Sequence, residues 1–187
     1  MDNAFLLILT GPPGAGKTTV SRLVASHYEP SAVIEADWFW TTVVNGGIAP
    51  WENEAEHQNI AMLRASLAAA GKMSGAGYAT VLEGGIGPWY MHVVRDELMT
   101  LQTTVSYVVL RPGLEECLSR ATSRRSEARH ANALADEGPI RHLYQEYSRL
   151  GPFEAHVIDT SFHDQETTAN QLLEHLSHGS RVLNLAD

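Results

Sequence analysis

The chain has 187 residues, enough for one well-packed domain and too few for two comfortable ones. Apolar residues make up 44% of it and there is one cysteine, which excludes an intramolecular disulfide and fits a reducing compartment. The formal net charge of −9 argues against non-specific binding to nucleic acid, and the apolar runs are too short for a signal peptide or a membrane span. We therefore expect a soluble cytoplasmic protein with no membrane or nucleic-acid partner, folded as a single domain over residues 1–187.

Short apolar runs alternate along the chain with longer stretches of helical periodicity. Runs that are apolar throughout are typical of strands buried on both faces, as in a parallel sheet. The predicted strands are residues 5–9, 32–35, 79–83, 105–110 and 156–158. The predicted helices are residues 17–28, 54–72, 89–101, 114–124, 139–150 and 165–177. This alternation predicts an α/β domain with right-handed crossovers, in which ligands bind beyond the carboxyl ends of the strands.

A glycine-rich loop between the first strand and the first helix carries the pattern Gly11-x-x-x-x-Gly16-Lys17-Thr18, which in this context predicts a phosphate-binding loop. Glycine permits a close approach of backbone N–H groups to a phosphate, and the helix N-terminus adds partial positive charge. Lys17 is expected to bridge the β- and γ-phosphates and Thr18 to offer its hydroxyl to Mg²⁺. The predicted nucleotide-binding residues are Gly11, Gly14, Ala15, Gly16, Lys17, Thr18 and Thr19. The alternative is a tight βα turn with no ligand.

Two carboxylates, Glu35 and Asp37, follow the second strand and point the same way if the segment is extended. We predict that Asp37 is the general base for an acceptor hydroxyl and that Glu35 holds Mg²⁺ through water. The alternative role for Asp37 is a cap on the helix that follows.

The segment of residues 83–89 contains three glycines and a proline, which favours a close backbone approach to a ligand over a strand interior. Asp37, Trp38, Glu83, Gly84 and Gly85 are the predicted substrate-binding residues, and Glu83 either shares the water shell of the metal or binds an acceptor hydroxyl. A plain tight turn is the alternative. Six aromatic residues near this site form either a pocket wall or ordinary core packing. They are Trp38, Phe39, Trp40, Trp51, Trp89 and Tyr90.

An arginine-rich stretch follows the fourth strand. Arg120 and Arg124 are four residues apart and share a helix face. We predict a lid over about residues 120–138, in which Arg124 stabilises transition-state charge and Arg120 stacks on the nucleotide or contacts phosphate. The alternative is a solvated helix face whose arginines pair with nearby glutamates.

These residues together resemble the P-loop small-molecule kinase group, which includes shikimate kinase, gluconate kinase and chloramphenicol phosphotransferase. The resemblance spans about residues 5–178 and is carried by the phosphate-binding loop, by Glu35-x-Asp37 and by Gly84-Gly85-x-Gly87. It implies a three-layer αβα fold with a five-stranded parallel sheet in the order 2-3-1-4-5. It also implies ATP and Mg²⁺ as cofactors, with Asp159 and Thr160 near the adenine base; no guanine-recognition signature is present.

The chain departs from this group in two places. Glu83 stands alone where a pair of aspartates is usual, and Trp38-Phe39-Trp40 replaces the arginine pattern that binds the shikimate carboxylate. Arg95 is a further candidate for binding an anionic acceptor.

We expect an ATP- and Mg²⁺-dependent enzyme that transfers the γ-phosphate to a hydroxyl group of a small molecule, namely a metabolite, a nucleoside or nucleotide, or an antibiotic. The alternatives are a polynucleotide 5′-hydroxyl kinase and a non-catalytic, nucleotide-gated binding protein. The identity of the acceptor, the oligomeric state, the role of residues 179–187 and the choice between Glu35 and Glu83 as the main acid near the metal stay open.

Overall fold

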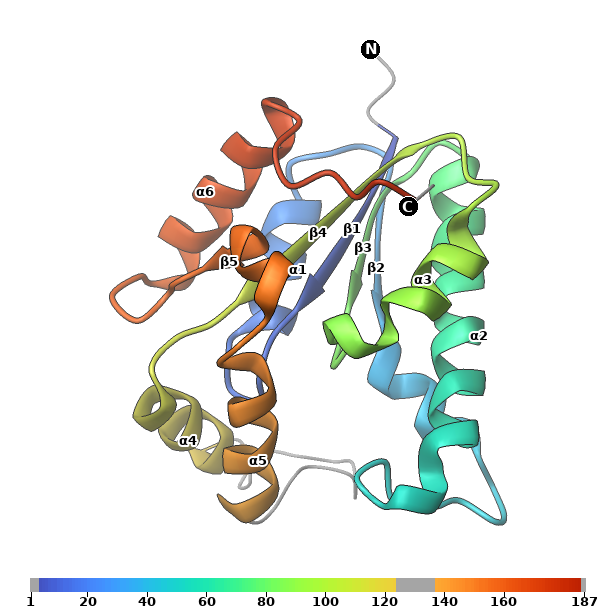
Figure 1. Cartoon of the computed structure of the whole chain (residues 1–187). Helices are drawn as coiled ribbons and strands as arrows, with labels where there is room; N and C mark the ends of the chain where they lie inside the picture. Colours follow the sequence, from blue (N-terminus) through green and yellow to red (C-terminus); the bar gives the residue numbers. More distant parts are fainter. Residues whose placement is uncertain (1–3, 124–136, 186–187) are drawn as a thin grey trace.

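The computed structural model describes residues 4–123 and 137–185, arranged around a five-stranded sheet (Figure 1). The strands are β1 (Phe5–Thr10), β2 (Ser31–Glu35), β3 (Ala79–Glu83), β4 (Thr104–Leu110) and β5 (Val157–Ile158). Their order is β2-β3-β1-β4-β5 and every pair is parallel, as the sequence predicts. β1 lies in the centre of the sheet, so the loop that follows it opens at the middle of the carboxyl edge.

Helices cover both faces of the sheet and form the two outer layers (Figure 1). They are α1 (Lys17–Ala25), α2 (Glu56–Gly75), α3 (Met91–Leu98) and α6 (Gln165–Ser177), and the chain also forms α4 (Leu114–Ser123) and α5 (Glu137–Tyr147). Leu6 and Ile8 of β1 pack in the core cluster under α2 and α3, whereas Leu7 and Leu9 pack in the cluster under α1 and α6. Alternate residues of one strand therefore hold both layers, as the continuous apolar run requires.

The helices α4 and α5 lie beyond the carboxyl end of the sheet, next to the loop after β1 (Figure 1). Arg141 of α5 pairs with Glu137 at 3.1 Å and approaches Glu115 of α4 at 3.9 Å. Within the described residues, no helix combines the length and the hydropathy that a bilayer crossing needs.

Short 3₁₀ helices replace parts of the predicted elements. They are η1 (Ala36–Thr42), η2 (Asn53–Ala55), η3 (Pro88–Tyr90) and η5 (Gly151–His156). The predicted helix over residues 89–101 is divided into η3 and α3 because Pro88 opens a tight turn, closed by the bond from Tyr90 N to Gly87 O at 3.0 Å. Similarly, the extended segment expected to carry Asp37 ends at Glu35, where the backbone turns into η1. The extended-segment argument for the direction of the Asp37 side chain therefore does not hold.

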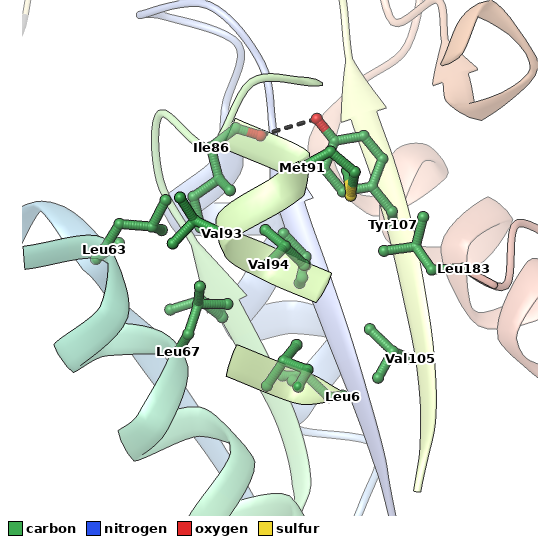
Figure 2. Close-up of a cluster of buried hydrophobic side chains, with 14 of the residues drawn as sticks. Leu6, Leu63, Leu67, Ile86, Met91, Val93, Val94, Val105, Tyr107 and Leu183 are labelled. Carbon is green, nitrogen blue, oxygen red and sulfur yellow. Dashed lines mark hydrogen bonds between the residues drawn. The ribbon is translucent and has the colours of Figure 1, made fainter. Parts of the chain in front are cut away.

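Residues 179–185, which we call the tail, pair with the edge of β4 that β5 leaves uncovered. β5 covers only Val109 and Leu110, and the tail runs antiparallel beside the first half of β4. Tyr107 N donates to Arg181 O at 3.0 Å, and Leu183 N donates to Val105 O at 2.8 Å. Leu183 is only 8% exposed and lies beside Val105 and Tyr107 in the core (Figure 2). The tail therefore protects a sheet edge that would otherwise be unpaired.

Leu183→Ala is expected to lower the free energy of unfolding by about 2–3 kcal/mol, the lower part of the range for removing a buried leucine side chain. Urea denaturation followed by circular dichroism measures this change. The control is Val182→Ala, because Val182 is next in sequence and 44% exposed; we expect a change within about 0.5 kcal/mol. Equal, small effects of both substitutions would show that the tail does not contribute to the core.

Candidate functional site

The loop between β1 and α1 is held against two other elements at positions where only glycine fits. Gly11 has φ 144° and Gly14 has φ 82°, both in the left-handed region. A Cβ at Gly11 would lie 2.1 Å from the carbonyl oxygen of Leu110, and one at Gly14 would lie 2.2 Å from that of Cys117. The loop is therefore fixed between the end of β4 and α4. Cys117 is fully buried, and this burial raises the pKa of its thiol to about 11.

Lys17 extends its ammonium group back over this loop. Its Nζ donates to Gly11 O at 3.0 Å and to Pro12 O at 3.2 Å. Gly16, just before the first residue of α1, has φ 90°, and the helix starts with its free N–H groups next to the loop. A cation, a helix N-terminus and a glycine-rich backbone therefore lie together at this loop, and these are the groups that bind an oxyanion such as phosphate.

The hydroxyl of Thr18 and the carboxylate of Glu83 form a direct hydrogen bond. Thr18 Oγ1 donates to Glu83 Oε1 at 2.7 Å. Glu83 is the last residue of β3 and stands opposite Leu9 of β1 in the sheet register. It is 5% exposed, and this burial raises its pKa, although the nearby Lys17 and the Thr18 bond act in the opposite direction. The sequence named both residues but not this pairing, because the register between β1 and β3 was needed to see it.

The Thr18–Glu83 pair fits a magnesium site at the loop. Mg²⁺ prefers oxygen ligands and usually retains several waters, so one hydroxyl with an adjacent carboxylate offers the donor types it needs. Glu35 is placed differently: although it stands opposite Glu83 in the register, its Oε1 accepts from Arg22 Nη2 at 2.8 Å on a partly exposed surface. The structure therefore brings Thr18 to Glu83 and Glu35 to Arg22. A metal-binding role for Glu35 stays a prediction.

Asp37 lies in the first turn of η1, exposed and beside the start of the glycine segment. A Cβ at Gly84 would lie 2.8 Å from Ala36 Cβ and 3.3 Å from Asp37 Oδ1, so the absence of a side chain at Gly84 lets the two segments touch. Within the described part of the chain, the Asp37 carboxylate makes no hydrogen bond, and no side-chain cap is seen on η1. The capping alternative therefore gains no support, and the carboxylate is available to a ligand.

The segment after β3 forms a fixed wall. Tyr107 Oη donates to Ile86 O at 2.8 Å, and Ile86 itself is 2% exposed (Figure 2). Further along, the indole of Trp89 lies directly on Gly87, since a Cβ there would come within 2.2–2.4 Å of three indole atoms. We call residues 84–89 the wall. It touches Asp37 at Gly84, ends at the indole of Trp89, and is held in the middle by Ile86, which packs in the core.

The sequence left open whether the aromatic residues near this wall line a pocket or pack in the core, and the structure divides them between these two roles. Trp40 and Tyr90 pack against the core, and Trp40 Nε1 donates to Asn59 Oδ1 at 2.8 Å. Trp38 and Trp89, by contrast, are 60% and 39% exposed, and Trp51 is also exposed.

One of the exposed rings is connected to the phosphate-binding loop. The ring of Trp89 lies edge-on against Tyr147 of α5, with centroids 5.2 Å apart, and the buried Tyr147 hydroxyl bonds Thr10 Oγ1 at 2.7 Å. Arg111 follows β4 directly and supports the end of α5 by donating to Tyr147 O at 3.0 Å. Its guanidinium also pairs with Glu154 of η5. Sequence reasoning missed Tyr147 and Arg111, which carry no motif.

A second cleft lies on the other side of the loop, between α1, α4 and the segment before α6. It is lined by Ala15, Gly16, Val20, Arg120, Thr160, His163, Asp164, Gln165 and Thr168. Thr160 Oγ1 and His163 Nδ1 are buried in this region without a hydrogen-bond partner among the described residues. Unpaired buried polar atoms suit a polar ligand, but the cleft encloses only about 10 Å³, so a nucleoside would enter it only if the lining residues moved apart.

Two of the predicted nucleotide contacts have partners of their own in this structure. Arg120 lines the cleft but pairs with Glu116 at 2.9 Å, as the solvated-face alternative expects. Asp159 Oδ1 accepts from both the backbone N and the hydroxyl of Ser161, and these bonds lower the pKa of Asp159. Arg124 and the rest of the predicted lid between α4 and α5 lie outside the described residues, so the role of Arg124 stays a prediction.

The fold is that of the P-loop small-molecule kinases, which are its structural neighbours. Shikimate kinase from Acinetobacter baumannii, solved with shikimate, is 23% identical with a TM-score of 0.61, and the match covers 95% of this chain and 96% of that one. The tunicamycin resistance protein of Deinococcus radiodurans is 18% identical with a TM-score of 0.64, covering 97% and 99%. The Mycobacterium tuberculosis APS kinase, solved with AMPPNP and APS, is 14% identical with a TM-score of 0.62, covering 93% and 98%.

No protein-family model and no curated protein matches the chain. At the identities found among solved structures, the likeness establishes the fold.

Glu83→Gln is expected to raise the melting temperature of the nucleotide-free protein at neutral pH, by about 2–4 °C, the shift that 1 kcal/mol produces in a domain of this size. The reason is that burial raises the pKa of Glu83, so the folded state disfavours the charged form. Because the wild-type carboxylate becomes protonated as pH falls through this raised pKa, the difference should shrink in acid. Thermal unfolding at several pH values measures it, and a glutamine variant less stable at neutral pH would contradict the burial argument.

Proposed function

We propose that the protein transfers the γ-phosphate of ATP to a hydroxyl group of a small molecule, with Mg²⁺ as the metal. The observation that supports this most is the convergence of three features at one edge of the sheet. The loop after β1 carries Lys17, and the Thr18–Glu83 pair adjoins this loop. Asp37 stands beside Gly84, which is the residue that follows Glu83 in the chain. A tight βα turn without a ligand would not need a buried carboxylate against Thr18.

In this proposal the chain binds ATP with its loop backbone and Lys17, and the nucleoside enters the cleft beside Thr160. Thr18 and Glu83 hold Mg²⁺, directly or through water, and the metal would neutralise charge on the β- and γ-phosphates. Asp37 accepts the proton of the acceptor hydroxyl while the new oxygen–phosphorus bond forms and the bond to the β-phosphate oxygen breaks, releasing ADP. Arg124 is proposed to stabilise the developing charge. Positioning and charge neutralisation supply most of the acceleration.

Asp37→Asn is expected to lower acceptor-dependent ADP release by about 10²–10⁴-fold, the usual contribution of a general base, with ATP affinity unchanged. The assay measures ADP release with Mg-ATP over sugars, sugar acids, shikimate, nucleosides, nucleotides, hydroxyl-bearing antibiotics and a 5′-hydroxyl oligonucleotide. Asp96→Asn is the matched control, because Asp96 pairs with Arg64 on the outer surface of α3. Transfer at the wild-type rate by Asp37→Asn would remove the base from the proposal.

The same assay distinguishes the two candidate acids near the metal. Because Glu83 bonds Thr18 and Glu35 pairs with Arg22, we propose Glu83 as the acid that supports Mg²⁺. Glu83→Gln should then need a higher Mg²⁺ concentration for half-maximal ADP release than Glu35→Gln. The reverse order would assign the metal to Glu35.

A further inference from the structure

The two segments that meet at Asp37, which are η1 and the segment after β3, each carry an exposed aromatic ring. Trp38 is the neighbour of Asp37 in η1 and is 60% exposed, and Trp89 lies on Gly87 with 39% exposed. Gly84, which touches Asp37, and Gly87 are three residues apart, so their Cα atoms are at most about 11 Å from each other. The two tryptophans therefore arise from backbone positions close to Asp37, Trp38 as its neighbour in the chain and Trp89 through its contact with Gly87.

One of these two rings is fixed and the other is less constrained. Trp89 is held from below by Gly87 and from the side by Tyr147, whose hydroxyl bonds Thr10. Trp38 makes an edge-on contact with Phe39, with centroids 6.2 Å apart. An immobile ring in contact with the core and a second, more exposed ring are suited to hold a flat or apolar face between them.

The charges around these rings are mainly negative. Three carboxylates lie at this edge, those of Glu35, Asp37 and Glu83. Lys17 faces the phosphate-binding loop. Most arginines of the described residues have a carboxylate partner, in the pairs Arg22–Glu35, Arg64–Asp96, Arg111–Glu154, Arg120–Glu116 and Arg141–Glu137. Arg22 already pairs with Glu35 and Lys17 lies near Glu83, so within the described residues Asp37 is the carboxylate of the three without a cation beside it. An anionic acceptor whose hydroxyl reaches Asp37 would meet that charge, which costs Coulomb energy unless a further cation compensates for it.

Arg95, Arg149 and Arg181 have no carboxylate partner within the described residues, and Arg95 of α3 is the candidate that the sequence named. Its Nε is buried and makes no hydrogen bond within the described part of the chain. The substitution Arg95→Ala therefore tests directly whether the protein uses an anionic acceptor.

From the rings and the charges we infer that the acceptor is an uncharged hydroxyl compound with a planar or apolar face, which stacks on Trp38 and Trp89. This inference rests on the proposed function and adds the substrate class to it. The two tryptophans determine specificity by orienting the acceptor so that its hydroxyl meets Asp37. They take no part in the proton transfer.

The experiment compares neutral acceptors with anionic ones. Each of the four ribonucleosides is paired with both its 5′- and its 3′-monophosphate, so that either hydroxyl stays free in one of the two anions. Chloramphenicol is a further neutral aromatic compound, and glucose is a neutral compound without a flat apolar face. The readout is kcat/KM from acceptor-dependent ADP release. We expect turnover of neutral aromatic compounds, with kcat/KM lower by about tenfold or more for each monophosphate and for glucose, since one lost favourable contact of 1.4 kcal/mol is a factor of ten.

The variants test the two rings. Trp38→Ala and Trp89→Ala should each raise the KM for the acceptor by about 10- to 100-fold, the range for losing a base–aromatic stack, without changing the KM for ATP. Trp89→Phe should recover much of the loss, which separates stacking from a folding defect. Met99→Ala is the control, because Met99 is 70% exposed at the opposite end of α3. It should change neither constant.

Two results would overturn the inference while the proposed function stands. One is a preference for anionic acceptors that Arg95→Ala abolishes, and the other is acceptor turnover that neither tryptophan substitution alters. A protein that binds ATP but releases ADP with none of these compounds, nor with the wider panel above, would instead overturn the proposed function and the inference with it.

Discussion

The hydrogen bond between Thr18 and Glu83 is the interaction on which the site depends. It exists because β1 and β3 are parallel neighbours in register, so the last residue of β3 stands beside the strand that leads into the phosphate-binding loop. Burying a carboxylate there disfavours its charged form, and Lys17 partly offsets that cost. Under the proposed function, this carboxylate would support a divalent cation beside a triphosphate, and that role would offset its cost to the stability of the fold.

Close approach of backbones is the second constraint, and glycine makes it possible. Gly11 and Gly14 let the loop after β1 touch the end of β4 and the backbone of α4, while Gly84 lets η1 touch the wall after β3. At each of these positions a Cβ would lie 2.1–2.8 Å from a neighbouring atom, too close for the present packing. Elements that are distant in sequence can therefore meet at one edge of the sheet. The contacts of Tyr147 with Trp89 and with Thr10 connect the segment after β3 with the end of β1, where the loop begins.

Much of the fold could be predicted from the sequence, because strands buried on both faces leave continuous apolar runs and the loop pattern fixes which strand precedes it. β3 and α6 begin and end where the sequence predicts, and the resemblance gave the strand order. The site was harder, since side-chain partners depend on register and on local turns. The sequence alone could not show that Glu83 rather than Glu35 meets Thr18, that Asp37 lies in a 3₁₀ turn, or that the tail covers β4. Leu183 gave no signal because the large apolar residues after α6, which are Val182, Leu183 and Leu185, form too short a run to show a period.

Phosphoryl transfer is the central claim, and following the label of γ-³²P-ATP tests it most directly. The protein is incubated with Mg²⁺ and the acceptor panel, with Lys17→Ala in parallel, because the Lys17 ammonium lies over the loop. The account predicts that label becomes covalently attached to an acceptor hydroxyl, and that Lys17→Ala abolishes this attachment. Label that stays in ATP, or that is released only as inorganic phosphate whatever the acceptor, would contradict the account and leave a nucleotide-binding protein that does not transfer phosphate.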